Sequence, residues 1–165
     1  DYKQTIQQIC WKRIKENETM SVRENIASNL LSTISGISSP ITIKKATRQP
    51  FQLDELSDKQ YPAVIVQTSE ETREDSELGS GAKTRIGTID FSILGFVKGA
   101  ESNIDTLRNQ LITAIETALE SDITRSSNAL DTEVTSVETD EGTLFPIGGI
   151  RMVVRCTYEF QAGTP

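Results

Sequence analysis

The alternation of apolar and polar residues divides this chain into helical and strand-like segments. Just after Met20, Ser21 and Glu24 match a capping box, in which the serine hydroxyl accepts from the Glu24 amide and the glutamate side chain reaches back to the cap. Apolar residues then recur at helical spacing until Gly36. They are Val22, Ile26, Leu30 and Ile34. The pattern predicts a first helix that starts after Ser21 and ends at Gly36.

The 19 residues before Met20 have a pattern of their own. Apolar residues at helical spacing, with a tryptophan alongside, favour a short amphipathic helix. They are Ile6, Ile9, Cys10, Trp11 and Ile14. Because a new helix start follows at Met20, which could be an initiator, we expect residues 1–19 to be an N-terminal extension or docking arm. Residues 20–165 are then expected to form a single domain.

The middle of the chain predicts three strands and a second helix. Residues 41–50 alternate weakly and favour a strand, and a polar connection follows over residues 51–60. Ala63–Val66 is apolar on both faces, which is typical of a strand inside a sheet. Residues 84–99 predict a long strand with one apolar face, and residues 103–119 switch to helical spacing.

An acid-rich segment, residues 70–83, separates two of these strands. It holds five acids and one arginine before Lys83, together with a Gly-Ser-Gly run. Such a composition does not drive burial, so we predict a mobile loop.

The last third of the chain predicts a long β-hairpin. We expect residues 132–139 to pair with residues 149–160, in which apolar residues occupy every second position without a break. The apolar positions are Ile150, Met152, Val154, Cys156, Tyr158 and Phe160. The predicted fold class is therefore α+β, with a mainly antiparallel sheet, two main helices packed on one face and a long C-terminal β-hairpin.

The tip of this hairpin, residues 140–149 (DEGTLFPIGG), places apolar residues in a turn between acids and glycines. In one interpretation, Leu144, Phe145 and Ile147 anchor a neighbouring protein, and Pro146 limits the loss of conformational freedom on docking. In the other, the loop folds back and Phe145 fills the subunit's own core.

Charge and composition narrow the function classes. A net charge of −7 and a pI near 4.7 argue against a nucleic-acid binder, although an acidic wall would let DNA pass without adhering. Cys10 and Cys156 do not form a disulfide framework, and two reduced thiols are expected. No apolar run approaches a membrane span and the start lacks a secretory pattern, so we expect a soluble, unexported chain.

The usual catalytic groups are missing from the sequence. The chain has no histidine, which removes the commonest general base and zinc ligand. Residues 79–83 (GSGAK) precede a predicted strand rather than a helix, so a linker is expected instead of a phosphate loop. The carboxylates near residues 70–77 and 140–141 lack a cation-binding pattern. We therefore expect no catalytic residue, cofactor or metal site.

With these elements in order, the chain from about Met20 to its end resembles the tail terminator (tail completion or neck) proteins of long-tailed bacteriophages. The likeness rests on the opening amphipathic helix, the YPAVIV strand, the acid-rich loop and the strand RIGTIDFSILGFVKG. It continues through the helix IDTLRNQLITAIETAL and the hairpin that closes on IRMVVRCTYEF.

The resemblance implies a non-enzymatic virion protein, made in the host cytoplasm, that forms a ring, commonly a hexamer, at the head-proximal end of the tail. Its partners would be copies of itself, the tail tube protein and the head connector or neck protein, with genome DNA passing through the bore without specific binding. We expect no membrane partner. The candidate interface residues are Leu144, Phe145, Pro146, Ile147, Glu70, Glu71, Glu74, Asp75, Arg151 and Arg155.

Three alternatives stay open at this point. The nearest is a head–tail joining or tail-tube subunit, which would polymerise instead of ending polymerisation. A carboxylate-metal-dependent hydrolase is the alternative from a different class, and a protein-binding domain of a host cell is the third.

Overall fold

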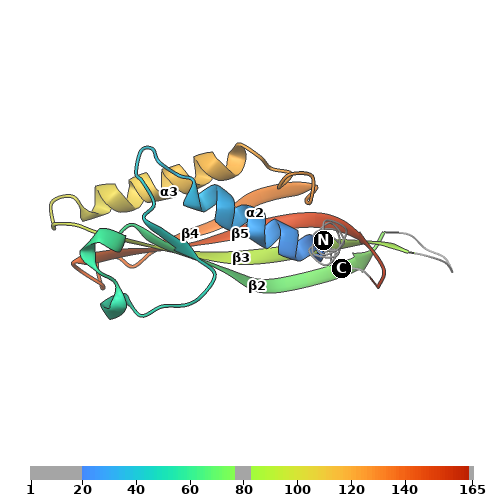
Figure 1. Ribbon diagram of the computed structural model, residues 1–165, viewed down its shortest axis with the longest axis horizontal. Coiled ribbons are helices and arrows are strands. Elements are labelled where there is room, and N and C mark those ends of the chain that lie inside the picture. The colour runs from blue at the N-terminus through green and yellow to red at the C-terminus, as the bar shows by residue number, and fades with distance from the viewer. Residues whose placement is uncertain (1–19, 77–82, 164–165) are drawn as a thin grey trace, which may run out of the picture.

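The computed structural model describes residues 20–76 and 83–163. Its helices and strands follow the order expected for an α+β fold (Figure 1). They are α2 (Val22–Ser35), β1 (Lys45–Thr47), β2 (Ala63–Asp75), β3 (Thr84–Lys98), α3 (Ile104–Glu120), β4 (Asp131–Thr139) and β5 (Ile147–Gln161). Two short 3-10 turns, Leu53–Glu55 and Asp58–Gln60, lie between β1 and β2. The predicted fold class is confirmed.

The described strands form one five-stranded sheet in the order β1-β2-β3-β5-β4. β1 is parallel to β2, and the other neighbours are antiparallel. β3 and β5 pair along their whole lengths, from Thr84 opposite Gln161 to Lys98 opposite Ile147. This long central pair gives the molecule its elongated shape in Figure 1.

Both helices cover the same face of the sheet, and the core lies between this helix layer and the sheet (Figure 1). The alternation in β3 and β5 determines which side chains enter this core, because successive strand residues point to opposite faces. Ile89, Phe91 and Ile93 of β3 are at most 1% exposed, as are Met152 and Val154 of β5. Burying each such side chain contributes roughly 1.5–3 kcal/mol, so this layer is the main source of stability.

The predicted α2 boundaries are confirmed, but one half of the capping box is not. The Ser21 hydroxyl accepts from the Glu24 amide at 3.4 Å, and the amide of the C-cap residue Gly36 donates to the carbonyl of Ser32 at 3.1 Å. The Glu24 carboxylate does not reach back to the cap. Instead, it accepts hydrogen bonds from Nη1 and Nη2 of Arg48, the latter at 3.1 Å. A charged donor gives a stronger hydrogen bond than a backbone amide does.

The predicted mobile loop at residues 70–83 is wrong over its first half. β2 continues to Asp75 and pairs with β3 as far as Asp75 opposite Arg85. The long β3 strand offers backbone partners to this segment, and cross-strand ion pairs from Lys83 and Arg85 offset the charge of Asp75. Residues 77–82, like the predicted N-terminal helix and Cys10, lie outside the described residues.

A second, smaller apolar cluster lies on the face of the sheet away from the helices. Leu56, Tyr61 and Ala63 are its buried members, so the predicted polar connection over residues 51–60 folds back onto the sheet. Phe51 packs edge-on against Phe96 with ring centroids 6.1 Å apart. The cluster also includes Leu53 and Ile147.

The predicted first strand shrinks to Lys45–Thr47, while the neighbouring strand β2 behaves as expected. All residues from Ala63 to Val66 are buried, with Val64 and Val66 in the main core and Ala63 in the small cluster. The prediction that this run is apolar on both faces of the sheet is confirmed.

Candidate interaction surfaces

The β4–β5 tip, residues 140–146, is a compact turn organised by Asp140. The Asp140 carboxylate accepts from the backbone amide of Leu144 at 3.0 Å, and its carbonyl accepts from the Thr143 amide at 3.0 Å. Its own amide donates to the carbonyl of Gly149 at 3.1 Å, which closes the hairpin beneath the turn. The first acid of the DEGTLFPIGG segment is therefore a structural residue of the tip.

Arg108 of α3 reaches the same carboxylate from the helix layer. Its Nη1 donates to Asp140, and its Nη2 donates to Asp105 at 3.2 Å. The side chains of Arg108 and Asp140 are 9% and 10% exposed. Burial raises the pKa of the Asp140 carboxyl, but hydrogen bonds from the Leu144 amide and from Arg108 outweigh this effect and hold the pKa below its ordinary value.

The two glycines that follow the tip are explained by close packing. A Cβ at Gly148 would stand 3.0 Å from Cγ of Arg108, so this glycine lets the arginine cross β5. A Cβ at Gly149 would stand 3.1 Å from a methyl group of Leu144, so that glycine lets the leucine lie back over the strand. Both contacts are tighter than ordinary van der Waals contact.

The apolar residues of the tip divide into two groups. Leu144 is 40% exposed and Phe145 is 54% exposed, and Pro146 is also exposed. The interpretation in which Phe145 fills the core is wrong for the described subunit, because Phe145 is exposed and belongs to neither apolar cluster. Ile147 is different: it starts β5 and packs into the small cluster.

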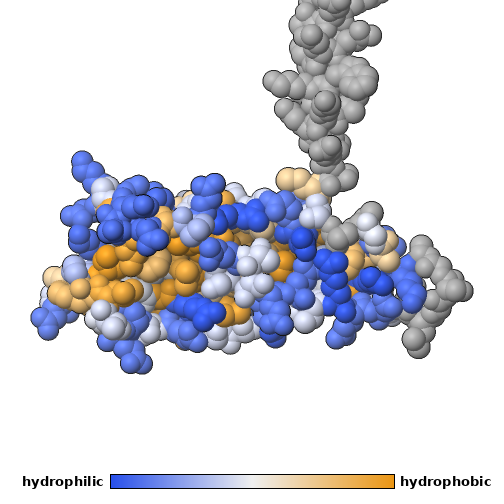
Figure 2. Space-filling view, turned by 90° about the horizontal axis from the view of Figure 1, so that it is seen from below, coloured by the Kyte–Doolittle hydropathy of each residue, from blue (hydrophilic) through white to orange (hydrophobic). Residues whose placement is uncertain are grey.

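A shallow hollow of about 220 Å³ adjoins the tip, and Leu144 is one of its lining residues. It lies on the face of the sheet away from the helices and combines apolar side chains with a charged rim. Its lining residues are Leu94, Phe96, Glu138, Thr139, Asp140, Leu144, Gly149, Ile150 and Arg151. Figure 2 shows apolar side chains gathered toward one end of the molecule, the end at which the tip and the 3-10 turns lie in Figure 1. Leu144 thus lines a surface depression, and Phe145 is its exposed neighbour in the turn.

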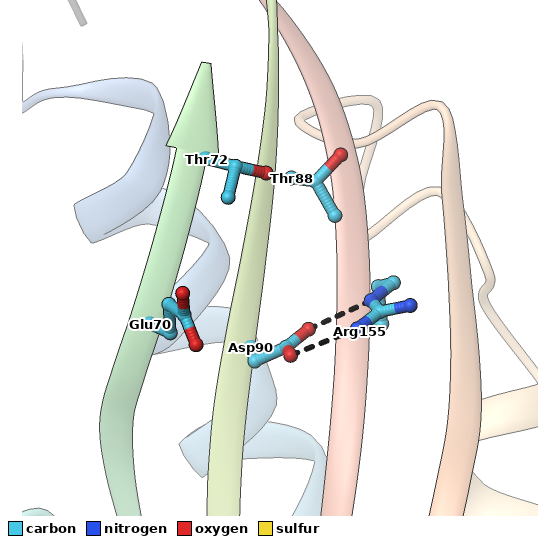
Figure 3. Close-up of a pocket in the computed structure, with 5 residues that line it drawn as sticks. All are labelled: Glu70, Thr72, Thr88, Asp90 and Arg155. Atoms are coloured by element: carbon cyan, nitrogen blue, oxygen red, sulfur yellow. Dashed lines mark hydrogen bonds and ion pairs between the residues drawn. The ribbon is translucent and has the colours of Figure 1, made fainter.

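A second hollow, of about 260 Å³, lies further along the same face and is polar (Figure 3). Arg155 crosses it and donates to Asp90 from Nε at 2.9 Å and from Nη2 at 3.0 Å. The hydrogen bonds to Asp90 raise the pKa of Arg155. Glu70 faces the same hollow without an ion-pair partner among the described residues. Arg155 therefore pairs with an adjacent strand, and acid remains in excess around it.

Glu71 lies on the other side of the sheet, because a β-bulge between Thr68 and Glu71 shifts the register of β2. Its carboxylate accepts from Arg23 at 2.9 Å, from Arg73 at 2.6 Å and from the Tyr158 hydroxyl at 2.7 Å. Burial raises the pKa of Glu71, but these donors outweigh it and lower the pKa below its ordinary value. Burial and the acceptor Glu71 raise the pKa of Tyr158 to about 12. Glu71 is thus engaged within its own subunit.

The remaining candidate residues are more exposed. Asp75 accepts from Arg85 at 2.7 Å and from Lys83 at 3.2 Å, and Glu74 is exposed. Arg151 donates to the Ser92 hydroxyl at 3.4 Å and lies 3.7 Å from Glu138. The structure therefore groups Arg151 with the tip hollow and leaves the acids of β2 apart from it.

Sequence reasoning missed Arg108, although a signal was present. Arg108 stands at helical spacing between Ile104 and Leu111, so it interrupts the apolar stripe of α3. A charged residue on a buried helix face needs a partner of opposite charge, and Asp140 is an acid at the end of a predicted strand. The two positions are 32 residues apart, which is why the sequence alone did not join them.

In the parts of the chain that the structure describes, no cluster of three or more metal-ligating side chains is present. Within the same residues, no helix has the length and apolar character needed to cross a membrane.

Comparison with known proteins gives one family match. A family model described as "Bacteriophage Tail Tube Terminator Protein" matches residues 16–163, so the match begins slightly before Met20. A solved structure described as "Virion of native gene transfer agent (GTA) particle" is similar with 11% identity and a TM-score of 0.35, over 85% of this chain and 92% of that chain. No curated protein matches the chain in sequence.

Proposed function

The chain belongs to the family of bacteriophage tail tube terminator proteins, and from that membership we propose that it forms a ring, most simply a hexamer, on the head-proximal end of the tail tube. As a structural protein of the phage tail, it acts by contact with its neighbours. The ring ends tube polymerisation and presents the surface on which the head connector assembles.

The exposed tip is the observation that supports this proposal. Leu144 and Phe145 are exposed on a turn at one end of an elongated subunit, and Leu144 lines the adjacent hollow together with apolar side chains of the sheet. Exposed aromatic side chains next to a depression are typical of the few residues that contribute most binding energy at protein interfaces. We assign the tip to the contact with the tail tube protein.

The face around Arg155 is proposed to line the bore. Arg155 is surrounded by Asp90, Glu70 and Glu133, so one cation stands among three acids. An acidic wall repels the phosphates of DNA and lets the genome slide through. Retardation of duplex DNA by the assembled protein at ordinary salt would contradict this assignment.

The ring is tested with the purified full chain by light scattering and negative-stain electron microscopy. Discrete closed rings of constant mass are expected, because a cyclic arrangement satisfies its own interfaces and leaves none for further growth. A tail-tube subunit would instead give filaments. A monomer at all concentrations, or open filaments, would overturn the proposal.

A further inference from the structure

The ion pair between Arg108 and Asp140 lies directly beneath the tip and joins it to α3. Both side chains are nearly buried, and Nε of Arg108 has no hydrogen-bond partner. Removing two charges from water is costly, so a pair in this environment contributes little net stability compared with apolar residues of the same volume. The role of the pair is therefore inferred from the groups that it connects and not from its contribution to stability.

The two oxygens of the Asp140 carboxylate have separate tasks. Oδ1 accepts from Arg108, which belongs to the helix layer, and Oδ2 accepts from the amide of Leu144 at 3.0 Å. One carboxylate thus connects a rigid helix to the residue immediately before Phe145. Gly148 is part of the arrangement, because a side chain there would meet Arg108.

We infer that Arg108 and Asp140 form a positioning pair that fixes the tip in its docking conformation before assembly. The inference depends on the proposed docking role of Leu144 and Phe145. A turn that is ordered in the free subunit loses less conformational freedom when it binds, so the positioning pair strengthens docking without touching the partner.

The experiment uses Asp140→Asn, which removes the negative charge and leaves one acceptor oxygen where Arg108 and the Leu144 amide now use two. The matched control is Asp105→Asn, because Asp105 also accepts from Arg108 but has a 76% exposed side chain and lies outside the tip. Purified variants are titrated into extracts of cells infected with phage that lack this protein. The readout is the protein concentration that gives half of the maximal phage yield.

Asp140→Asn is expected to raise that concentration by about tenfold, while Asp105→Asn leaves it unchanged. Phe145→Ser is expected to raise it at least as much in the otherwise unaltered chain. Phe145→Ser should have a much smaller effect when it is added to Asp140→Asn, because a displaced tip no longer presents the Phe145 side chain to the partner. Such non-additivity distinguishes positioning of the tip from a general loss of stability.

Hydrogen exchange provides the second measurement. The Leu144 amide should exchange at least about tenfold faster in Asp140→Asn, whereas amides of the β3–β5 ladder keep their protection. Arg108→Lys, which keeps the charge but loses the planar fork, replaces Asp140→Asn if that variant does not fold. It is expected to loosen the tip in the same way.

Two results would overturn the positioning pair. The first is an Asp140→Asn variant in which the Leu144 amide keeps its protection and the half-maximal concentration is unchanged. The second is a double variant whose half-maximal concentration rises by the product of the two single effects of Asp140→Asn and Phe145→Ser. Normal titration of Phe145→Ser alone would instead refute docking through the tip. The two failures are therefore distinguishable.

Discussion

At the scale of single residues, the least expected feature is a second buried arginine. Arg125 is 0% exposed and follows α3 in a segment of mostly polar residues. Its Nη2 donates to the carbonyl of Leu119, and its Nη1 lies 3.5 Å from Oδ1 of Asn29. Burial lowers the pKa of Arg125. The carbonyl groups at the C-terminal end of α3 carry the partial negative charge that compensates this cation.

Replacing Arg125 with methionine should therefore destabilise the protein by about 1–3 kcal/mol, because the volume is kept while the buried, charged hydrogen bond to the Leu119 carbonyl is lost. That carbonyl keeps the Asp122 amide as a donor, at 3.3 Å. Urea unfolding followed by circular dichroism measures the change. Arg85→Ala is the control: its pair with Asp75 is between two side chains that are each 40% exposed, and such surface pairs contribute about 0–1 kcal/mol. Equal losses for the two variants would contradict the interior role of Arg125.

At the scale of elements, the β3–β5 pair depends on close approach between a glycine and an aromatic ring. Gly87 stands opposite Tyr158 in the register, and a Cβ at Gly87 would lie 2.6 Å from the tyrosine ring. The Tyr158 side chain is fully buried and its hydroxyl donates to Glu71, and both features restrict movement of the ring. The glycine is required by space, since its backbone angles are not in the left-handed region.

Gly87→Ala should accordingly cost about 1–3 kcal/mol of unfolding free energy, the usual range for overpacking a core. Gly36→Ala is the matched control, because a Cβ there meets only backbone oxygens at 3.5 Å. It should change stability by less than about 1 kcal/mol. Thermal and urea unfolding of both variants provide the measurement, and a neutral Gly87→Ala would show that the Tyr158 ring can shift.

The sequence predicted those elements whose apolar period extends over many residues. The alternation in residues 150–160 and the stripe from Ile104 to Leu119 gave β5 and α3 correctly. The prediction failed where pairing with another strand determines the structure. The acid-rich residues of β2 form a strand because β3 is long enough to pair with them. At the tip, the exposed Phe145 was one of two open interpretations, and the Arg108–Asp140 contact depends on folding that local patterns do not encode.

At the scale of the whole molecule, carboxyls are the side chains that titrate as pH falls from neutrality. The chain has no histidine, which is the only side chain whose ordinary pKa lies near neutrality. Burial raises the pKa of the Cys156 thiol to about 11, which keeps it neutral there. Several carboxyls have pKa values below their ordinary ones because they accept hydrogen bonds from cations, hydroxyls or amides. They are Glu24, Glu71, Asp75, Asp122 and Asp140.

These directions determine how the unfolding free energy should depend on pH. A carboxyl whose pKa is lower in the folded state stabilises the fold above its unfolded pKa, and this contribution is lost as pH falls through the folded pKa. The unfolding free energy should therefore be nearly constant from about pH 8 to about pH 5 and decrease below about pH 4, near the ordinary pKa values of Asp and Glu. Urea titrations at intervals of one pH unit measure the profile. The Asp140→Asn variant should show a shallower acid decline, since it lacks one of the contributing groups, and a step in stability between pH 6 and 7 would contradict the assignment of the pH dependence to carboxyls.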